Sequence, residues 1–469
     1  MVFSSITFMF AFLPAVLLAY YISPRSIRNF ILMLFSMLFY AWGEPKYILV
    51  MLVSILVGYA MGLITDKYMK EDKKNIAKLA VAFSVVLNLG ILFFFKYIGF
   101  FTENINHIPS IDIKVLDIEL PIGISFYTFQ ILSYAVDVYR GKAKVQKDII
   151  NLATYITLFP QLIAGPIVRY ETVAKELDDR TENMDDFGEG AKRFIIGLGK
   201  KVLIANVASE VFETLSTLPA EENSVVLSWI CAIAFTLRIY FDFAGYSDMA
   251  IGLGRMFGFH FLENFNYPYI SKSITEFWRR WHISLSTWFR DYVYIPLGGN
   301  RVGKAKTLRN IFIVWLLTGF WHGAAWNFII WGLYYFVLLM LEKLFLGKVL
   351  EKIPSLFSRI YALFLINLGW VIFAYDDMGK LGQALKNMFG LGGIEVINDL
   401  TIFTLISYAL FFVIAFVGAT PIPKKFMNWL KSKTKAYDVL EVVLLFGVMV
   451  LATAFLASDA FNPFLYFRF

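Results

Sequence analysis

Two of the four histidines in the chain stand where an ionisable side chain is unusual, and His322 is the more conspicuous. It lies in LLTGFWHGAAWNFIIWG, an apolar stretch at apparent membrane depth. An ionisable group in such a stretch is costly to bury and by default suggests function. The glycines and alanines around His322 leave space for a substrate to approach. A neutral histidine that is hydrogen-bonded between helices explains this position about equally well.

His282 lies in SITEFWRRWHISLSTWFRDYVYIPLGGNR, the densest polar segment of an otherwise apolar chain. Glu276 precedes Arg279 and Arg280 at the three- and four-residue spacings of helical ion pairs. A solvated amphipathic helix explains these charges, but it explains the tryptophans between them less well. We therefore favour a polar path buried inside the protein, or a cytoplasmic mouth lined by aromatic side chains. The candidate residues for lining such a path are Trp281, Arg290, Asp291, Trp321, Trp326 and Asn327.

For the other candidate residues we favour structural roles. His107 lies in the polar loop FTENINHIPS, and His260 is interpreted as an interfacial or structural residue. Arg238 and Asp242 lie four residues apart and can form a buried ion pair, which is more often structural than catalytic. The single cysteine, Cys231, excludes an intramolecular disulfide and a cysteine-rich metal site. Because the sequence contains no phosphate loop, nucleophile elbow or zinc-helix motif, we expect no metal and no resident cofactor.

The composition indicates which kind of scaffold must hold these residues. Of the 469 residues, 58% are hydrophobic and 17% are charged, whereas soluble domains carry about 25% charged residues. The apolar runs are long and continuous, and a helix of about twenty such residues crosses a bilayer. The sequence therefore predicts an all-α, multi-pass integral membrane protein that forms a single domain over residues 1–469. The predicted spans lie near residues 5–22, 28–42, 47–65, 78–101, 121–136, 150–168, 224–241, 311–319, 325–344, 358–374, 401–419 and 438–457.

The segments between the spans predict the orientation. Residues 66–78 and 421–437 each carry five lysines, and such basic loops face the cytoplasm. Both termini are then extracytoplasmic, and the first apolar stretch, which lacks the features of a signal peptide, is a retained membrane helix. We expect the half-apolar stretches 191–217 and 270–295 to lie in the interface or to re-enter the protein. The net charge of +7 gives no reason to expect a nucleic-acid partner.

Two long segments resemble the membrane-bound O-acyltransferases. They are RRWHISLSTWFRDYVYIPLGGNR and TGFWHGAAWNFIIWG, and they look most like the bacterial branch that O-acetylates alginate, peptidoglycan and other envelope polysaccharides. The D-alanyl-teichoic-acid branch shares the WHIS and WHG blocks, but YIPLGGNR is more typical of the polysaccharide acetylases. The resemblance extends over nearly the whole chain through residues 121–141, 159–170, 240–259 and 263–269.

This resemblance implies a fold of about 11–13 helices, with re-entrant or interfacial helices, around a tunnel that crosses the membrane. It also implies a bacterial cell-membrane location and a cytosolic acyl thioester, acetyl-CoA, as the donor substrate. His322 falls on the family's invariant histidine, and His282 falls on its second motif position. The chain contains no SGNH-type esterase domain, so a separate extracytoplasmic partner of that kind is implied, with an envelope polysaccharide as the final acceptor.

The chemistry of these residues agrees with that implication. Acyl transfer from a thioester to a hydroxyl needs a base for the proton and stabilisation of an oxyanion. A histidine with a pKa near 6.5 can serve as the base at neutral pH, and we assign this role to His322. His282 can orient the donor or stabilise charge. The basic residues after YIPLGG can attract the phosphates of coenzyme A, although the positive-inside rule explains them equally well: Arg301, Lys304, Lys306 and Arg309.

The chain ends in FNPFLYFRF, where Tyr466 stands among four phenylalanines. This ending resembles a C-terminal motif of the same acyltransferase system, in which the tyrosine is thought to carry the acyl group to the outer partner. The predicted topology independently places this ending on the side of the membrane opposite the donor. An aromatic belt that anchors the last helix in lipid is the alternative interpretation.

Two other functions remain open from the sequence. The enzyme can transfer D-alanine or a longer acyl group instead of acetyl, because the width of a tunnel depends on packing. A flippase for a lipid-linked saccharide can use the same polar residues as a passage, but it needs neither a base at membrane depth nor an acyl acceptor.

Overall fold

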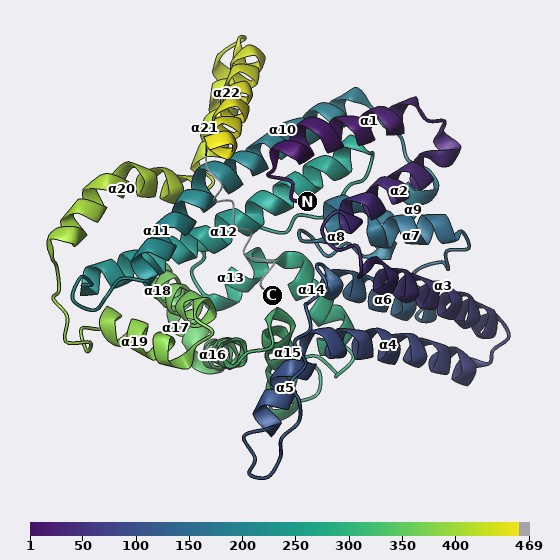
Figure 1. The fold of residues 1–469 in the computed structure, drawn as a ribbon, viewed down its shortest axis with the longest axis horizontal. Coiled ribbons are helices and arrows are strands. Elements are labelled where there is room, and N and C mark those ends of the chain that lie inside the picture. Colours follow the sequence, from purple (N-terminus) through teal and green to yellow (C-terminus); the bar gives the residue numbers. More distant parts are fainter. Residues whose placement is uncertain (459–469) are drawn as a thin grey trace. The chain divides into compact units, whose positions relative to one another are not determined.

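The computed structural model describes residues 1–458, and within this range it consists of helices joined by loops (Figure 1). The extended backbone that pairs in the described chain is a single isolated bridge between Ser224 and Glu395. The prediction of an all-α fold is therefore confirmed. Tyr466 and its neighbours lie outside the described residues.

Seven helices of the described chain are long and apolar enough to cross a membrane, so the chain is a multi-pass membrane protein. Each satisfies its backbone polar groups internally, as a lipid environment requires. They are α3 (Ile48–Lys70), α4 (Lys74–Lys96), α12 (Val225–Met256), α16 continuing through η6 and α17 (Trp326–Lys352), α18 (Ser355–Ala374), α20 (Asp399–Gly418) and α22 (Tyr437–Ser458).

Four further predicted spans are also helical, although they are shorter or more polar. They are η1 and α1 (Phe8–Phe12 and Leu13–Ile22), α2 (Arg28–Ala41), α6 (Ile124–Tyr139) and α15 (Lys304–His322).

The predicted span at 150–168 is wrong as one continuous helix. The chain forms α7 (Ile149–Thr157) and the short α8 (Phe159–Leu162), and Leu158 between them has an extended ψ of 109°. Pro160 explains the break. A proline inside a helix cannot donate the hydrogen bond to the residue four earlier, and its ring collides with that carbonyl.

The described chain divides into two compact units. The first contains residues 1–194 and 246–262. Within it, α3, α4 and α6 lie side by side (Figure 1). The buried Glu182 carboxylate pairs with Arg28 at 2.8 Å and accepts a hydrogen bond from Tyr20. Its remaining helices are η2 (Arg25–Ile27), α5 (Ile98–Ile105), α9 (Tyr170–Asp178) and most of α10 (Met184–Gly199).

The second unit contains residues 195–245 and the described chain from 263 onward. Its centre is the antiparallel pair α15 and α16, with α18 against α16 (Figure 1). Two glycines permit the close crossing of α15 and α16. A Cβ on Gly319 would collide with the Phe328 carbonyl oxygen, and one on Gly332 would lie 2.5 Å from the Trp315 carbonyl oxygen.

The other helices of this second unit are short. They are η3 (Lys200–Ala205), α11 (Asn206–Ser216), η4 (Pro268–Ile270), α13 (Ile274–Arg280), α14 (Ile283–Phe289), η5 (Arg290–Tyr294), η6 (Glu342–Leu346), α17 (Gly347–Lys352), α19 (Met378–Met388) and α21 (Ile422–Lys433). The stretch 191–217 is thus a continuous helical run that contains a π-helical segment, whereas 270–295 consists of short helices separated by a turn. A single domain over residues 1–469 stays a prediction.

The orientation can be tested with single cysteines. We expect Lys70→Cys and Lys433→Cys to resist a membrane-impermeant maleimide in intact cells and to react once the cells are opened, because basic loops stay inside. Glu221→Cys, in the loop before α12, is the matched control and should react in intact cells. The native Cys231 is buried and gives little background. Labelling of position 70 or 433 in intact cells would overturn the orientation.

Candidate functional site

His322 is the last residue of α15, and its ring is buried among aromatic side chains. Its centroid lies 5.0 Å from that of Trp331 on α16 and 5.2 Å from that of Phe373 on α18, both edge-on. The helix ends here, and the backbone is extended at the next residue, Gly323, where ψ is 160°. The structure therefore places this ionisable ring where three helices of the second unit meet.

His282 lies at the junction of two short helices, α13 and α14. Its backbone has φ 42° and ψ 55°, the left-handed conformation that residues other than glycine rarely adopt. This turn points the imidazole into the protein, where it is only 1% exposed. The backbone of the next residue, Ile283, donates to the Asn264 carbonyl at 3.0 Å, which fixes the turn.

Asn264 also holds the His282 side chain. The Asn264 Oδ1 atom accepts from the Ser284 backbone N–H at 3.3 Å and the Ser284 hydroxyl at 2.9 Å, and it lies 3.1 Å from His282 Nδ1. Because an amide oxygen can only accept, Nδ1 must be the donor, and the tautomer inferred from this network leaves Nε2 as an acceptor. Nε2 has no hydrogen-bond partner within residues 1–458.

The charge state of His282 follows from its burial. Desolvation lowers its pKa to about 3, because a buried site disfavours the charged form. The ring is therefore neutral at physiological pH and is a weak base. This environment fits a side chain that orients a substrate through Nε2 better than one that removes a proton.

One indole brings the two histidines together. The Trp321 ring lies 5.0 Å from His322 and 5.8 Å from His282, between centroids. Trp321 is buried, as are both histidines. The two histidines, 40 residues apart in sequence, thus share one aromatic neighbour.

The remaining predicted path residues lie in different settings. Trp281 is buried and contacts Trp370 at 4.7 Å between ring centroids. Asn327 is buried, and its Nδ2 donates to the Phe373 carbonyl at 3.1 Å. Trp326 is 51% exposed. Arg290 and Asp291 pair with each other at 2.7 Å, with the arginine largely exposed.

Arg238 and Asp242, which the sequence predicted as a pair, each have an ionic partner that the sequence did not indicate. Asp242 pairs with Lys201 at 2.7 Å, and both side chains are almost completely buried. Arg238 pairs with Glu213 at 2.9 Å. Buried charges held in this way fit the structural role that we expected for them.

A cavity of about 810 Å³, which we call the Trp315 cavity, lies in the second unit between α13, α15, η6, α17 and α18. Trp315 forms part of its wall, and its ring centroid lies 6.0 Å from that of Trp331. The Trp331 ring in turn packs against the ring of His322. The indole rings of Trp315 and Trp331 thus lie between the cavity and the His322 ring. Its cationic lining residues are Lys272, Arg279, Arg290 and Lys343.

Glu342, another lining residue, stabilises the helix that leads to His282. Its buried carboxylate accepts from the Ile274 backbone N–H at 2.7 Å, and from the Thr275 N–H at 2.8 Å and hydroxyl at 2.6 Å. The first N–H groups of a helix lack internal partners, and a carboxylate there is favourable. Glu342 thereby fixes the start of α13.

Sequence reasoning missed Asn264 and Glu342, although each had a signal. Asn264 belongs to ENFNYPY, a segment that carries the family resemblance. Glu342 is an acidic residue inside the apolar stretch 325–344, where an ionisable side chain by itself merits attention.

The sequence profile of the membrane-bound O-acyltransferase family matches residues 142–375, which include both histidines, Asn264 and Glu342. Full-length relatives agree with this match. Proteins named probable alginate O-acetylase in Pseudomonas putida and Azotobacter vinelandii are each 39% identical, over 100% of both chains. The chain belongs to the membrane-bound O-acyltransferase family. It is therefore an O-acyltransferase enzyme, and the resemblance seen in its sequence is confirmed.

More distant relatives within the family differ in the substrates that their names state. The peptidoglycan O-acetyltransferase of Helicobacter pylori is 32% identical over 100% of this chain and 98% of its own. The teichoic acid D-alanyltransferase of Bacillus subtilis is 34% identical, but over only 48% of this chain and 59% of its own.

The role of Asn264 can be tested by substitution. We expect Asn264→Ala to lower the rate of acyl transfer about tenfold or more, because His282 and Ser284 lose a shared acceptor worth about 1–3 kcal/mol. The assay is transfer by the purified protein in proteoliposomes, with its thermal midpoint measured in parallel. Asn88→Ala is the matched control, since Asn88 is also a buried asparagine and bonds the Ser84 carbonyl within α4. Equal rates for the Asn264 variant and the native enzyme would refute the assignment.

Proposed function

We propose that this enzyme moves an acetyl group from cytosolic acetyl-CoA to the extracytoplasmic side of a bacterial cell membrane for O-acetylation of an envelope polysaccharide. The observation that carries the proposal is the pair of buried histidines, His282 and His322, in contact with one indole. The full-length relatives with O-acetylase and O-acetyltransferase names support acetyl as the group transferred. The D-alanyltransferase matches only about half of the chain, so it supports D-alanine as the transferred group less strongly than the full-length relatives support acetyl.

In this proposal His322 is the general base. The Tyr466 hydroxyl oxygen attacks the thioester carbonyl carbon while His322 takes the hydroxyl proton, and the carbon–sulfur bond then breaks, which leaves the acetyl group on Tyr466. The proton passes to the leaving thiolate, so coenzyme A departs as a free thiol. Removal of the proton as the new bond forms is the contribution expected of a positioned base.

His282 has a positioning role in this scheme. Its neutral ring and partnerless Nε2, which can only accept, support a hydrogen bond from an amide N–H of the pantetheine arm of acetyl-CoA rather than proton removal. Such a bond would orient the thioester for attack, and orientation alone contributes a large share of many rate enhancements.

The Trp315 cavity is the proposed donor site. Four cationic and three acidic side chains line it, and its ammonium and guanidinium groups can bind phosphate oxygens through charge-assisted hydrogen bonds. It adjoins the first turn of α18 through Ser355 and Ser358, the end of α18 that the positive-inside rule assigns to the cytoplasm. Acetyl-CoA is a substrate here, not a resident cofactor.

Two further components pass the acetyl group to the polysaccharide on the outer side of the membrane. An SGNH-type partner outside the membrane receives the acetyl group and places it on the glycan. Tyr466 carries the group to this partner as a phenyl ester, which is a more reactive acyl donor than an alkyl ester and suits onward transfer to a serine.

For the base, we expect His322→Ala to reduce acetyl transfer by a factor on the order of 10² to 10⁴. The measurement is release of label from acetyl-CoA by the purified protein and O-acetyl content of the envelope in cells. His107→Ala is the matched histidine control and should be normal. Membrane levels of both variants should equal that of the native chain, and normal acetylation by the His322 variant would remove this residue from the mechanism.

For the carrier, Tyr466→Phe keeps the aromatic ring and removes only the nucleophilic oxygen. We expect this variant to lose envelope O-acetylation as completely as Tyr466→Ala does, while it still inserts in the membrane. The readout is ester-linked acetate on the isolated polysaccharide. If the phenylalanine variant acetylates normally and only the alanine variant fails, the residue is an aromatic anchor and not a carrier.

A further inference from the structure

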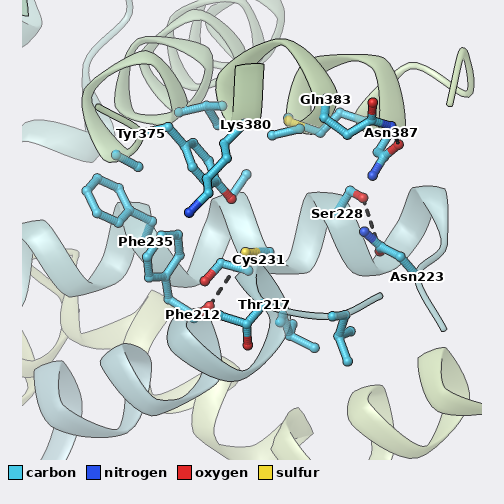
Figure 2. Close-up of a pocket in the computed structure, with 18 residues that line it drawn as sticks. Phe212, Thr217, Asn223, Ser228, Cys231, Phe235, Tyr375, Lys380, Gln383 and Asn387 are labelled. Atoms are coloured by element: carbon cyan, nitrogen blue, oxygen red, sulfur yellow. Dashed lines mark hydrogen bonds between the residues drawn. The ribbon is translucent and has the colours of Figure 1, made fainter. Parts of the chain in front are cut away.

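A second cavity of the same unit, of about 400 Å³, lies between α11, α12, the end of α18 and α19 (Figure 2). We call it the Lys380 cavity. Its volume is within the range of about 300–1,000 Å³ that is usual for small-molecule sites. Neither the donor nor the histidine pair accounts for it.

The lining of this cavity includes one cation and several polar side chains among mostly apolar ones. Lys380 projects into it toward Tyr375 and Cys231 (Figure 2), and its charge also acts on the Asp377 carboxylate, which is not part of the lining. No carboxylate stands among the described lining residues. The other polar lining residues are Ser216, Thr217, Asn223, Ser228, Gln383 and Asn387.

Several amide groups retain bonding capacity. Gln383 Nε2 donates to Asn387 Oδ1 at 2.8 Å, which leaves the Gln383 oxygen and the Asn387 nitrogen available. Asn223 Oδ1 accepts from Ser224 N–H at 2.8 Å, which leaves its nitrogen available. The cavity thus offers both donors and acceptors, the combination that sugar hydroxyls require, because a hydroxyl both donates and accepts.

The remaining wall is apolar, and it combines aromatic rings with aliphatic side chains such as Leu215, Val371 and Met388. Phe212 and Phe235 lie 4.9 Å apart between centroids at one end of the cavity, and such rings can cover the C–H face of a sugar. A lipid chain would leave the amides without partners, which is costly. A pyrophosphate would favour several cations and arginine forks, whereas a single lysine is a point charge suited to one carboxylate.

The cavity lies at the opposite end of α18 from the Trp315 cavity. Ala374 and Tyr375 line it at the end of α18, whereas Ser355 and Ser358 at the first turn line the other. A helix of 20 residues is about 30 Å long. The two cavities therefore open toward opposite faces of the membrane. Where the lysine-rich loops are cytoplasmic, the Lys380 cavity is extracytoplasmic.

The cavity also adjoins the transfer site. Phe373 contacts the His322 ring at 5.2 Å, and the next two residues of the chain line the cavity. A ligand held there would lie beside the residues that surround the proposed base.

We propose that the Lys380 cavity binds a carboxylate-bearing sugar unit of the acceptor polysaccharide, with Lys380 pairing the carboxylate and the amides of Gln383 and Asn387 binding hydroxyl or N-acetyl groups. This inference rests on the proposed function, since it presumes a polysaccharide acceptor. The polymers named for the full-length relatives, alginate and peptidoglycan, both contain sugars with carboxylates.

The test is direct binding to the full-length protein in detergent, measured by calorimetry and ligand-observed NMR. The probes are a hexuronate tetrasaccharide, its methyl ester and N-acetylmuramic acid. We expect at least one acidic probe to bind and the ester to bind at least tenfold more weakly. Lys380→Gln should weaken the acidic probe at least tenfold. Lys386→Gln, on the same helix but outside the cavity lining, is the control and should bind as the native chain does.

Activity separates this inference from the proposed function. Lys380→Gln should keep the cleavage of acetyl-CoA and lower the acetylation of the glycan. If neither acidic probe binds, or if the ester or the Lys380 variant binds equally well, the inference is wrong whatever the enzyme's activity. If the acidic probes bind through Lys380 but the native protein never cleaves acetyl-CoA, the sugar site stands and the proposed donor is wrong.

Discussion

The close crossing of α15 and α16 is the contact on which the site depends. Backbone atoms of the two helices meet at Gly319 and Gly332, where no Cβ fits. Only because the helices approach this closely does Trp331 reach the ring of His322. In lipid, where helices gain little from burying apolar surface against each other, small residues at such crossings allow the close packing that holds a bundle together.

A second constraint acts on the chain that carries His282. Helices α13 and α14 have seven residues each, too few to be stable by themselves. They are held by polar partners from outside, with Glu342 at the start of α13 and Asn264 at the turn before α14. Rigid aromatic packing thus surrounds one histidine, whereas a hydrogen-bond network holds the other.

The sequence predicted the features that depend on local composition. Long apolar runs predicted the helices, and the surroundings of His322 predicted its burial. Contacts between distant segments could not be predicted from composition, so neither the shared indole Trp321 nor the partners of Asp242 could be foreseen. The break at Leu158 was a different failure, since Pro160 indicated it but the hydropathy of the stretch outweighed that signal.

The left-handed backbone of His282 has a cost in stability. A residue other than glycine in this region costs on the order of 1 kcal/mol, so glycine is the residue that the fold itself would favour there. The chain instead keeps an imidazole and accepts a less stable turn. A broken local rule of folding is the pattern expected of functional sites, and the buried Nε2 of His282 is the chemical group that this turn places inside the protein.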